Sequence, residues 1–381
     1  MSSSAPSAPK EQTSAARNRL VLVVYTAAIF LSALLLFSVQ PLFTKMVLPR
    51  LGGSPAVWSV AMVFFQSLLL AGYAYAHLLM QVRSRIVPVA VHLVVLVVAM
   101  LTLPLSIASS FGEPPNSAYA FWLLGLFAVS IGLPFFALAA NNPMLQAWFV
   151  RTGHPAGPDP YFLYASSNIG SFLALLSYPV LLEPMFTLRT QNLMWTAGYG
   201  LLILLIAGCG VVLLRSPKAA ADLQREDTQA LPPGWVLRAR WIFLAAVPSG
   251  LLIAVTAHIS TDVAAAPLLW VLPLSLYLLT WVLVFQSRPL LPHNWMLMLQ
   301  PLAIAGVVVL LALGSEQNLL LTLGAHQLCF FVIAMACHGE LARTRPPAKC
   351  LTGFYVALSV GGMLGGLFAG LISPYAFSWV A

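Results

Sequence analysis

The chain has 381 residues, of which 60% are hydrophobic and 28 are charged, 18 basic and 10 acidic. Soluble domains carry about 25% charged residues, and in water a chain this apolar would expose aggregating patches. These numbers exclude a soluble globular protein and predict an integral membrane protein with the lipid bilayer as its partner. Eleven helices of about 21 residues, each crossing a ~30 Å hydrocarbon layer, would use roughly 230 residues, close to the hydrophobic share of the chain.

Residues 1–19 are polar and include Lys10, Arg17 and Arg19. No small-residue cleavage site follows at the right place, so we expect a polar cytoplasmic tail and a retained first helix rather than a signal peptide. A first half of six membrane spans then follows in residues 20–214. The predicted spans are 20–39, 56–80, 86–107, 118–140, 161–182 and 193–214.

A polar segment, residues 215–240, separates these spans from the rest of the chain. It carries several charges and contains Pro232-Pro233-Gly234, which marks it as a cytoplasmic linker. A second half follows in residues 241–381, with spans at 241–257, 263–285, 295–313, 319–336 and 351–377. The predicted fold is therefore an all-α integral membrane protein with about eleven transmembrane helices, arranged as six plus five.

The basic residues predict the orientation of the spans. With the N-terminus inside, fifteen of the eighteen lie in cytoplasmic segments, and only Lys45, Arg50 and Arg189 lie outside. One missed span would move every later loop to the other side of the membrane and spoil this agreement, so the basic residues support the number of spans as well. Eleven spans place the C-terminus outside, and we expect a twelfth span to be missing. The net charge of +8 does not indicate a nucleic-acid partner, because no basic cluster exceeds three residues.

Two short internal matches relate the halves. Residues 164–171 in the fifth span align with residues 355–362 in the eleventh, and residues 55–58 align with residues 267–270. Both matches pair a span with the span six places later. Many transporter folds are built from duplicated halves, so two pseudo-equivalent halves are predicted.

Enzyme chemistry is not indicated by any motif. The chain contains no serine-hydrolase, zinc-protease or phosphate-binding signature, so no catalytic residue and no cofactor are predicted. The four cysteines show no CxxC spacing, so neither a metal site nor a disulfide framework is expected.

Ionisable and polar groups in an apolar chain are costly, so each one marks a candidate site. The candidate binding or gating residues are Gln40, Lys45, Arg50, Asn168, Glu183, His258 and Asp262. Two interpretations of the charged ones stay open. Asp262 could pair with Lys45 or Arg50 across the halves, as a gate or a structural ion pair. Alternatively, Glu183 and Asp262 could form an acidic mouth that attracts a cationic solute.

Other polar and aromatic positions have simpler interpretations. Asn141-Asn142-Pro143 predicts the end of the fourth span, or a broken helix that lines a cavity. Residues 338–346 share an Arg-Thr pair with residues 151–160, which favours a docking or gating loop over a plain basic anchor. Tyrosines and tryptophans near span ends are expected in interfacial belts. These are Trp58, Tyr73, Tyr75, Trp148, Tyr161, Trp195 and Trp241.

Several loop and span-end motifs carry a family resemblance. They include Phe37-Ser38-Val39-Gln40-Pro41-Leu42, Leu51-Gly52-Gly53-Ser54-Pro55-Ala56-Val57-Trp58, Gly72-Tyr73-Ala74-Tyr75-Ala76-His77, Leu163-Tyr164-Ala165-Ser166-Ser167-Asn168-Ile169-Gly170-Ser171 and Ser260-Thr261-Asp262-Val263-Ala264-Ala265-Ala266-Pro267-Leu268-Leu269-Trp270. In these motifs the chain resembles bacterial membrane proteins described as fused major facilitator/spermidine synthase-like proteins.

The resemblance implies a major-facilitator-like bundle in the bacterial inner membrane that moves a small, cationic, polyamine-like solute. In that family a soluble domain similar to aminopropyltransferases follows the membrane region, and no counterpart of that domain is present in this sequence. The alternative function is therefore a membrane anchor or interaction module for a spermidine synthase-like partner, without transport activity.

Overall fold

A computed structural model of the chain describes residues 8–51, 55–108, 111–113, 115, 119–217, 233–259, 271–286, 290–313 and 319–377. Within these ranges every regular element is a helix. Nine helices are long and apolar enough to cross a membrane, and two shorter apolar helices, Ile86–Met100 and Val271–Val284, raise the described set to eleven. The all-helical, eleven-span prediction is confirmed.

The first half runs from α1 to α8. Its helices are α1 (Ala8–Leu51), α2 (Pro55–Met80), α3 (Ile86–Met100), α4 (Tyr119–Phe127), α5 (Leu133–Val150), α6 (Tyr161–Ser177), α7 (Glu183–Met185) and α8 (Leu188–Arg215). A π-helical turn, Ala128–Gly132, joins α4 to α5, and another, Tyr178–Leu182, joins α6 to α7. Each of these two pairs therefore crosses as one rod.

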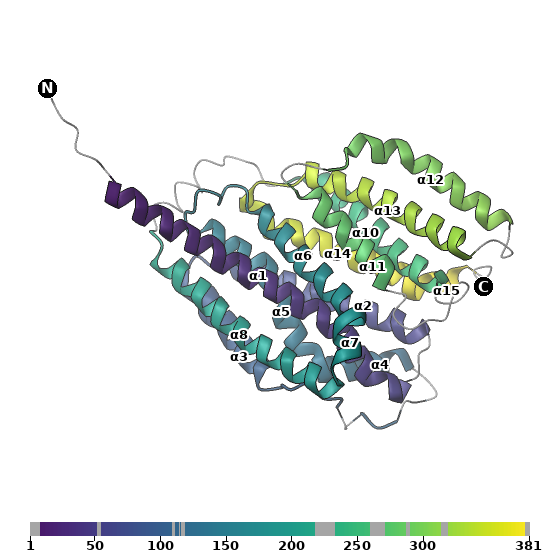
Figure 1. Cartoon of the computed structure of the whole chain (residues 1–381), viewed down its shortest axis with the longest axis horizontal. Coiled ribbons are helices and arrows are strands. Elements are labelled where there is room, and N and C mark those ends of the chain that lie inside the picture. Colours follow the sequence, from purple (N-terminus) through teal and green to yellow (C-terminus); the bar gives the residue numbers. More distant parts are fainter. Residues whose placement is uncertain are drawn as a thin grey trace.

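The second half contains the remaining helices. They are α10 (Trp235–His258), α11 (Val271–Val284), α12 (His293–Leu313), α13 (Leu319–Arg343), α14 (Leu351–Leu367) and α15 (Ser373–Ala376). A π-helical turn, Phe368–Ile372, joins α14 to α15 into one rod. Figure 1 shows this green-to-yellow group beside the purple-to-teal first half.

The predicted ends of two spans are wrong, and two helices begin before the predicted spans. Helix α1 begins at Ala8, inside the predicted polar tail, with Pro9 in its first turn, where proline is tolerated, and α10 begins at Trp235, inside the predicted linker. The third helix ends at Met100, before the predicted residue 107. The fourth span does not stop at Asn141-Asn142-Pro143, because α5 continues through Pro143 to Val150. Neighbouring helices in a bundle can compensate the backbone bond that a proline removes.

The helix packing repeats between the halves. In the first half α1 packs along α6, α2 against α5, and α3 against α5. Six spans later, α10 packs along α14, α11 against α13, and α12 against α13. The halves meet where α2 contacts α14 and where α6 contacts α11. These two contacts are equivalent, because α11 is the counterpart of α2 and α14 is the counterpart of α6. The structure therefore confirms two pseudo-equivalent halves.

The α8 helix has no described counterpart in the second half. It covers both α1 and α3 and buries a row of large side chains against them, including Trp195, Tyr199 and Leu202. Within the ranges that the structure describes, no helix takes the equivalent place against α10 and α12. Met296 is the one buried residue on α12, which lies at the edge of the bundle (Figure 1).

Two glycines in the longer sequence match explain why the repeated helix pairs pack so closely. A Cβ atom at Gly170 would lie 2.6 Å from the backbone oxygen of Phe30 on α1. A Cβ atom at the matching residue, Gly361, would overlap the backbone oxygen of Ile242 on α10. Small residues allow such approaches between membrane helices, where dispersion forces and hydrogen bonds replace the hydrophobic effect.

We predict that Gly170→Leu and Gly361→Leu each destabilise the protein, because the added side chain must push two backbones apart. Overpacking of this kind costs about 1–3 kcal/mol. Thermal unfolding in one detergent, followed by tryptophan fluorescence, should show a lower midpoint for both variants. Gly306→Leu on α12 is the matched control, because no atom lies within 4 Å of its Cβ position. Midpoints equal to that of the control would contradict the close approach.

Candidate functional site

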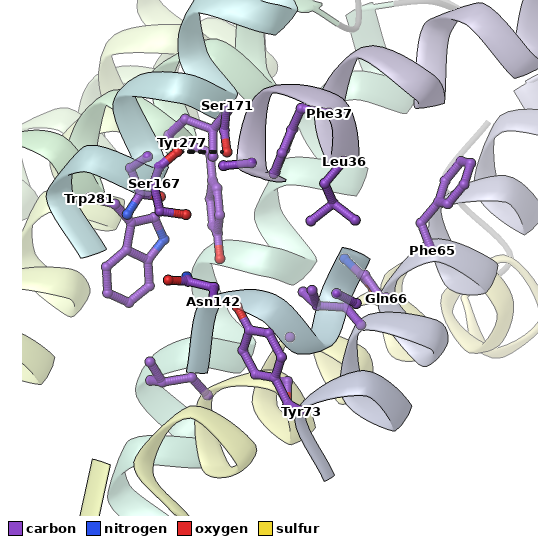
Figure 2. Close-up of a pocket in the computed structure, with 18 of the residues that line it drawn as sticks. Leu36, Phe37, Phe65, Gln66, Tyr73, Asn142, Ser167, Ser171, Tyr277 and Trp281 are labelled. Atoms are coloured by element: carbon purple, nitrogen blue, oxygen red, sulfur yellow. Dashed lines mark hydrogen bonds between the residues drawn. The ribbon is translucent and has the colours of Figure 1, made fainter. Parts of the chain in front are cut away.

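A cavity lies between the two halves, and its empty space, counted together with its opening to solvent, is about 1200 Å³. Its walls come from α1, α2, α5 and α6 on one side and from α10, α11 and α14 on the other. Figure 2 shows side chains from both halves pointing into this space. Duplicated transporters bind their solutes at such a repeat interface near the middle of the membrane, so the cavity is the candidate solute site.

The cavity lining is mostly apolar, with polar side chains set among Leu, Phe, Ala and Met residues, and it is uncharged over the part of the chain that the structure describes. The amide and hydroxyl side chains are Ser32, Gln40, Gln66, Asn142, Ser167, Asn168, Ser171, Ser249 and Ser359. Four larger rings with a polar atom, Tyr73, Tyr164, Tyr277 and Trp281, line it as well. The described lining residues include no Asp, Glu, Lys or Arg.

Many polar side chains on the cavity walls donate their hydrogens back to the protein. Asn168 Nδ2 donates to the backbone oxygen of Tyr164 at 2.8 Å. Ser171 Oγ donates to the Ser167 oxygen at 3.1 Å, and Ser359 Oγ donates to the Val356 oxygen at 3.0 Å. The two serine hydroxyls therefore have only acceptor lone pairs left for the cavity, and Asn168 keeps its acceptor oxygen and one of its two N–H donors.

Two hydrogen-bond chains cross from one half to the other in the cavity walls. Gln66 Nε2 on α2 donates to Ser249 Oγ on α10 at 2.9 Å, and Ser249 Oγ donates to the Gly362 oxygen at 2.9 Å. Tyr355 on α14 bonds Gln146 on α5, which in turn bonds a cavity residue of α5. Polar contacts therefore join the cavity walls in addition to the packing of α2 against α14 and of α6 against α11.

An aromatic floor closes the cavity toward the side on which α1 begins. It consists of Tyr73, Tyr161, Tyr164, Trp281, Phe285, Phe354 and Tyr355, which belong to one buried cluster. Tyr164 and Tyr355, the first residues of the longer sequence match, meet there with ring centroids 5.1 Å apart. The floor therefore brings the two repeats into contact at equivalent positions.

Outside this floor, two loops contact each other across the halves. Asp159, just before α6, accepts a hydrogen bond from Arg345, just after α13, at 2.9 Å. The Arg345 guanidinium lies 5.0 Å from the centre of the Tyr161 ring, and the Tyr161 hydroxyl donates to the Pro346 oxygen at 2.8 Å. These are the two loops that share the Arg-Thr pair, and their docking or gating role stays a prediction.

The structure separates the residues that the sequence singled out. Gln40 and Asn168 line the cavity. Lys45 and Glu183 form an ion pair with each other, joining α1 to α7 within the first half. The pairing of Lys45 with Asp262 across the halves is thus not the one observed.

The other three candidates give less information. Asp262 and the side chain of Arg50 lie outside the described residues. The His258 ring lies 4.8 Å from the His326 ring, where α10 contacts α13, and neither residue lines the cavity. The acidic mouth, which needs both Glu183 and Asp262, stays a prediction.

Sequence reasoning missed several residues of the site and its floor. Tyr73 was expected in an interfacial belt, but it lines the cavity. Trp148 and Trp241, with the same expectation, are 0% and 1% exposed inside the bundle. Burial depends on which face of a helix meets its neighbours, and nearness to a span end does not reveal that face. The paired asparagines before Pro143 were the one available signal for Asn142.

No protein-family model matches the chain, and no curated protein matches its sequence. Solved structures do match. The proton:xylose symporter XylE of the major facilitator superfamily, bound to 6-bromo-6-deoxy-D-glucose, aligns with a TM-score of 0.57 at 14% identity, covering 94% of this chain and 89% of that one. A bacterial homologue of the iron transporter ferroportin in an outward-facing state aligns with a TM-score of 0.58 at 16% identity, covering 92% of each chain.

Identities this low show the fold alone. They do not reach the spermidine synthase-like part of the resemblance, which stays a prediction. Together with the apolar helices and the repeated packing, the matches show a multi-pass membrane protein whose helices are arranged as in the major facilitator fold.

Proposed function

We propose that the protein transports a small, uncharged polar solute by opening the central cavity to each side of the membrane in turn. The observation that carries the proposal is the cavity between the halves, a mostly apolar space into which uncharged amides, hydroxyls and aromatic rings project. The inter-half contacts on its floor and in the loops beyond it are polar or aromatic. Such contacts can separate and re-form when the halves rock against each other.

The chemistry of the lining favours a polyhydroxylated solute. Hydroxyl groups would donate to the acceptor oxygens that Asn168 and the helix-bonded serines present. The faces of Tyr164 and Trp281 offer flat apolar surfaces for the carbon skeleton of such a molecule. That a neighbouring structure holds a glucose analogue agrees with this solute class at the level of the fold.

The polyamine-like solute expected from the sequence is the first competing proposal. Each ammonium group moved out of water without an opposite charge costs several kcal/mol. The described lining offers no carboxylate to compensate this cost. The second competitor is a membrane anchor for a synthase-like partner, which requires no solute movement at all.

For either function, we propose that the protein lies in the bacterial inner membrane with its N-terminus in the cytoplasm.

The first test is solute uptake by proteoliposomes. We predict counterflow of at least one neutral probe among ¹⁴C-labelled D-xylose, D-glucose and glycerol, and no uptake of ¹⁴C-spermidine. Tyr164→Ala and Asn168→Ala should lower that flux at least tenfold, because each removes a cavity contact worth about 1.4 kcal/mol or more. Leu302→Ala on α12, where the side chain is 70% exposed, is the matched control and should transport as the wild type does.

The outcomes of the uptake experiment separate the three proposals. Flux of spermidine alone would replace the neutral solute by the cationic one. Flux of no probe above that of empty vesicles would support the anchor and overturn transport.

The second test concerns the loop contact between the halves. We predict that Arg345→Gln loosens it, because both the Asp159 ion pair and the stacking on Tyr161 are lost. Partly exposed contacts of this kind are worth about 0.5–1 kcal/mol, so opening should rise about two- to fivefold. The readout is alkylation of Cys350 by a membrane-impermeant maleimide, in a protein whose other three cysteines are replaced by alanine.

Arg240→Gln is the matched control for this experiment. It also removes an ion pair, with Glu340, but that pair lies within the second half. An equal rise in the alkylation rate for both variants would contradict a gating role for Arg345.

A further inference from the structure

We propose that Asn142 is the cavity residue whose amide donates hydrogen bonds to the solute, because Gln146 and Tyr355 fix which side of that amide faces the cavity. The inference rests on the proposed function and narrows its solute class. The solute would be a neutral molecule with an acceptor oxygen toward α5 and hydroxyl donors toward α6 and α14.

The three residues form one chain of hydrogen bonds that joins the halves. The Tyr355 hydroxyl on α14 donates to Gln146 Oε1 at 3.0 Å. Gln146 Nε2 donates to Asn142 Oδ1, one helical turn away on α5, at 2.7 Å. Tyr355 and Gln146 are both 0% exposed, whereas Asn142 is partly exposed and lines the cavity. The chain therefore leads from the buried floor to the cavity wall.

The direction of this chain follows from the tyrosine. If both amides were turned around, Gln146 would donate to the Tyr355 oxygen, and the tyrosine proton would need another acceptor. Within the described residues the Tyr355 hydroxyl has no other hydrogen bond, and aromatic rings including Tyr73 and Tyr164 surround its ring. A buried O–H group whose proton has no acceptor costs about 1–3 kcal/mol. Tyr355 is thus held as the donor.

The donor role of Tyr355 then fixes the orientation of the side-chain amides of Gln146 and Asn142. Gln146 must turn its oxygen to Tyr355 and its nitrogen to Asn142, so Asn142 turns its oxygen to Gln146. The two N–H donors of Asn142 are left on the side away from Gln146, where the Tyr73 hydroxyl is a side-chain hydrogen-bond partner for one of them. Figure 2 shows Asn142 at the centre of the cavity, with the Tyr73 hydroxyl directed toward it.

This fixed donor differs from the other polar groups on the cavity walls. The amide nitrogen of Asn168 and the hydroxyls of Ser171 and Ser359 are already bonded to backbone oxygens. Asn142 therefore turns its amide nitrogen to the cavity, whereas Ser171 and Ser359 supply only acceptors and Asn168 supplies its oxygen and one remaining N–H. A solute that places an acceptor oxygen at Asn142 and hydroxyl groups at these residues satisfies both sets.

One experiment tests the orientation without any solute. Protein labelled with ¹⁵N in Asn and Gln side chains is placed in lipid nanodiscs, and exchange of the amide protons with water is followed by NMR. In the wild type, the Asn142 protons should exchange readily with cavity water and the Gln146 protons should be protected. Protection of both Asn142 protons would overturn the proposal, because the Tyr73 hydroxyl can engage only one of them and the other would have to be bonded to Gln146.

Two tyrosine variants sharpen this measurement. Tyr355→Phe removes the group that sets the direction, so Gln146 can invert and protection of the Asn142 protons should rise. Tyr199→Phe is the matched control, because Tyr199 is a 0% exposed tyrosine on α8 whose hydroxyl has no partner among the described residues. Identical spectra of the cavity amides in the wild type and in Tyr355→Phe would contradict the role of Tyr355.

Uptake then tests the contact with the solute. Asn142→Asp keeps the shape of the side chain and removes both N–H donors, so uptake of the neutral probe should fall at least tenfold. Uptake equal to that of the wild type would overturn the inference while leaving the proposed function intact. If wild-type vesicles take up no neutral probe, the proposed function is wrong. The claim that Asn142 donates to the solute is then wrong too, even if the NMR result supports the hydrogen-bond chain.

Discussion

The contact between Tyr164 and Tyr355 depends on how closely α6 approaches α1 and how closely α14 approaches α10. Six residues beyond each tyrosine, Gly170 and Gly361 let their helices lie against a backbone oxygen of the neighbouring helix. Lipid chains are as apolar as leucine, so helices in a bilayer gain stability from such close packing and from hydrogen bonds. The tyrosines of two separate repeats are thereby brought together on the floor of one cavity.

The contacts within and between the halves differ in kind. Inside each half, glycine-mediated backbone contacts form a rigid unit, and a single added side chain would disturb it. Between the halves, the described contacts include tilted and edge-on aromatic rings, an ion pair and short chains of hydrogen bonds. A rigid unit on each side of a separable interface is what rocking around a fixed site requires. The same interface encloses the cavity, so opening and solute binding involve the same residues.

Much of this architecture could be predicted from the sequence. Composition identified the membrane as the solvent, the apolar runs located the helices, and residues 164–171 and 355–362 revealed the repeat. Gln40 and Asn168 were found because polar residues inside apolar spans are costly and therefore noticeable. The charged candidates were less informative, because Glu183 satisfies Lys45 locally and neither residue lines the cavity.

The rest of the site could not be read from one sequence. The bond between Tyr355 and Gln146 joins residues 209 positions apart, and it depends on the rotation of two helices about their axes. The same rotation places Tyr73 in the cavity and buries Trp148, which sequence position had assigned to the membrane interface. Burial on a particular helix face is a tertiary property, and the weak periodicity of uniformly apolar spans does not encode it.

The central claim is that the two halves rock as units around the cavity. Pulsed electron–electron distance measurements in nanodiscs test it most directly, with one spin-label pair at Gln81 and Arg238, on the side where α1 begins, and another at Arg189 and Leu313, on the opposite side. The account predicts two populations for each pair, and conditions that lengthen one distance should shorten the other. A single, unchanging distance for both pairs would contradict it.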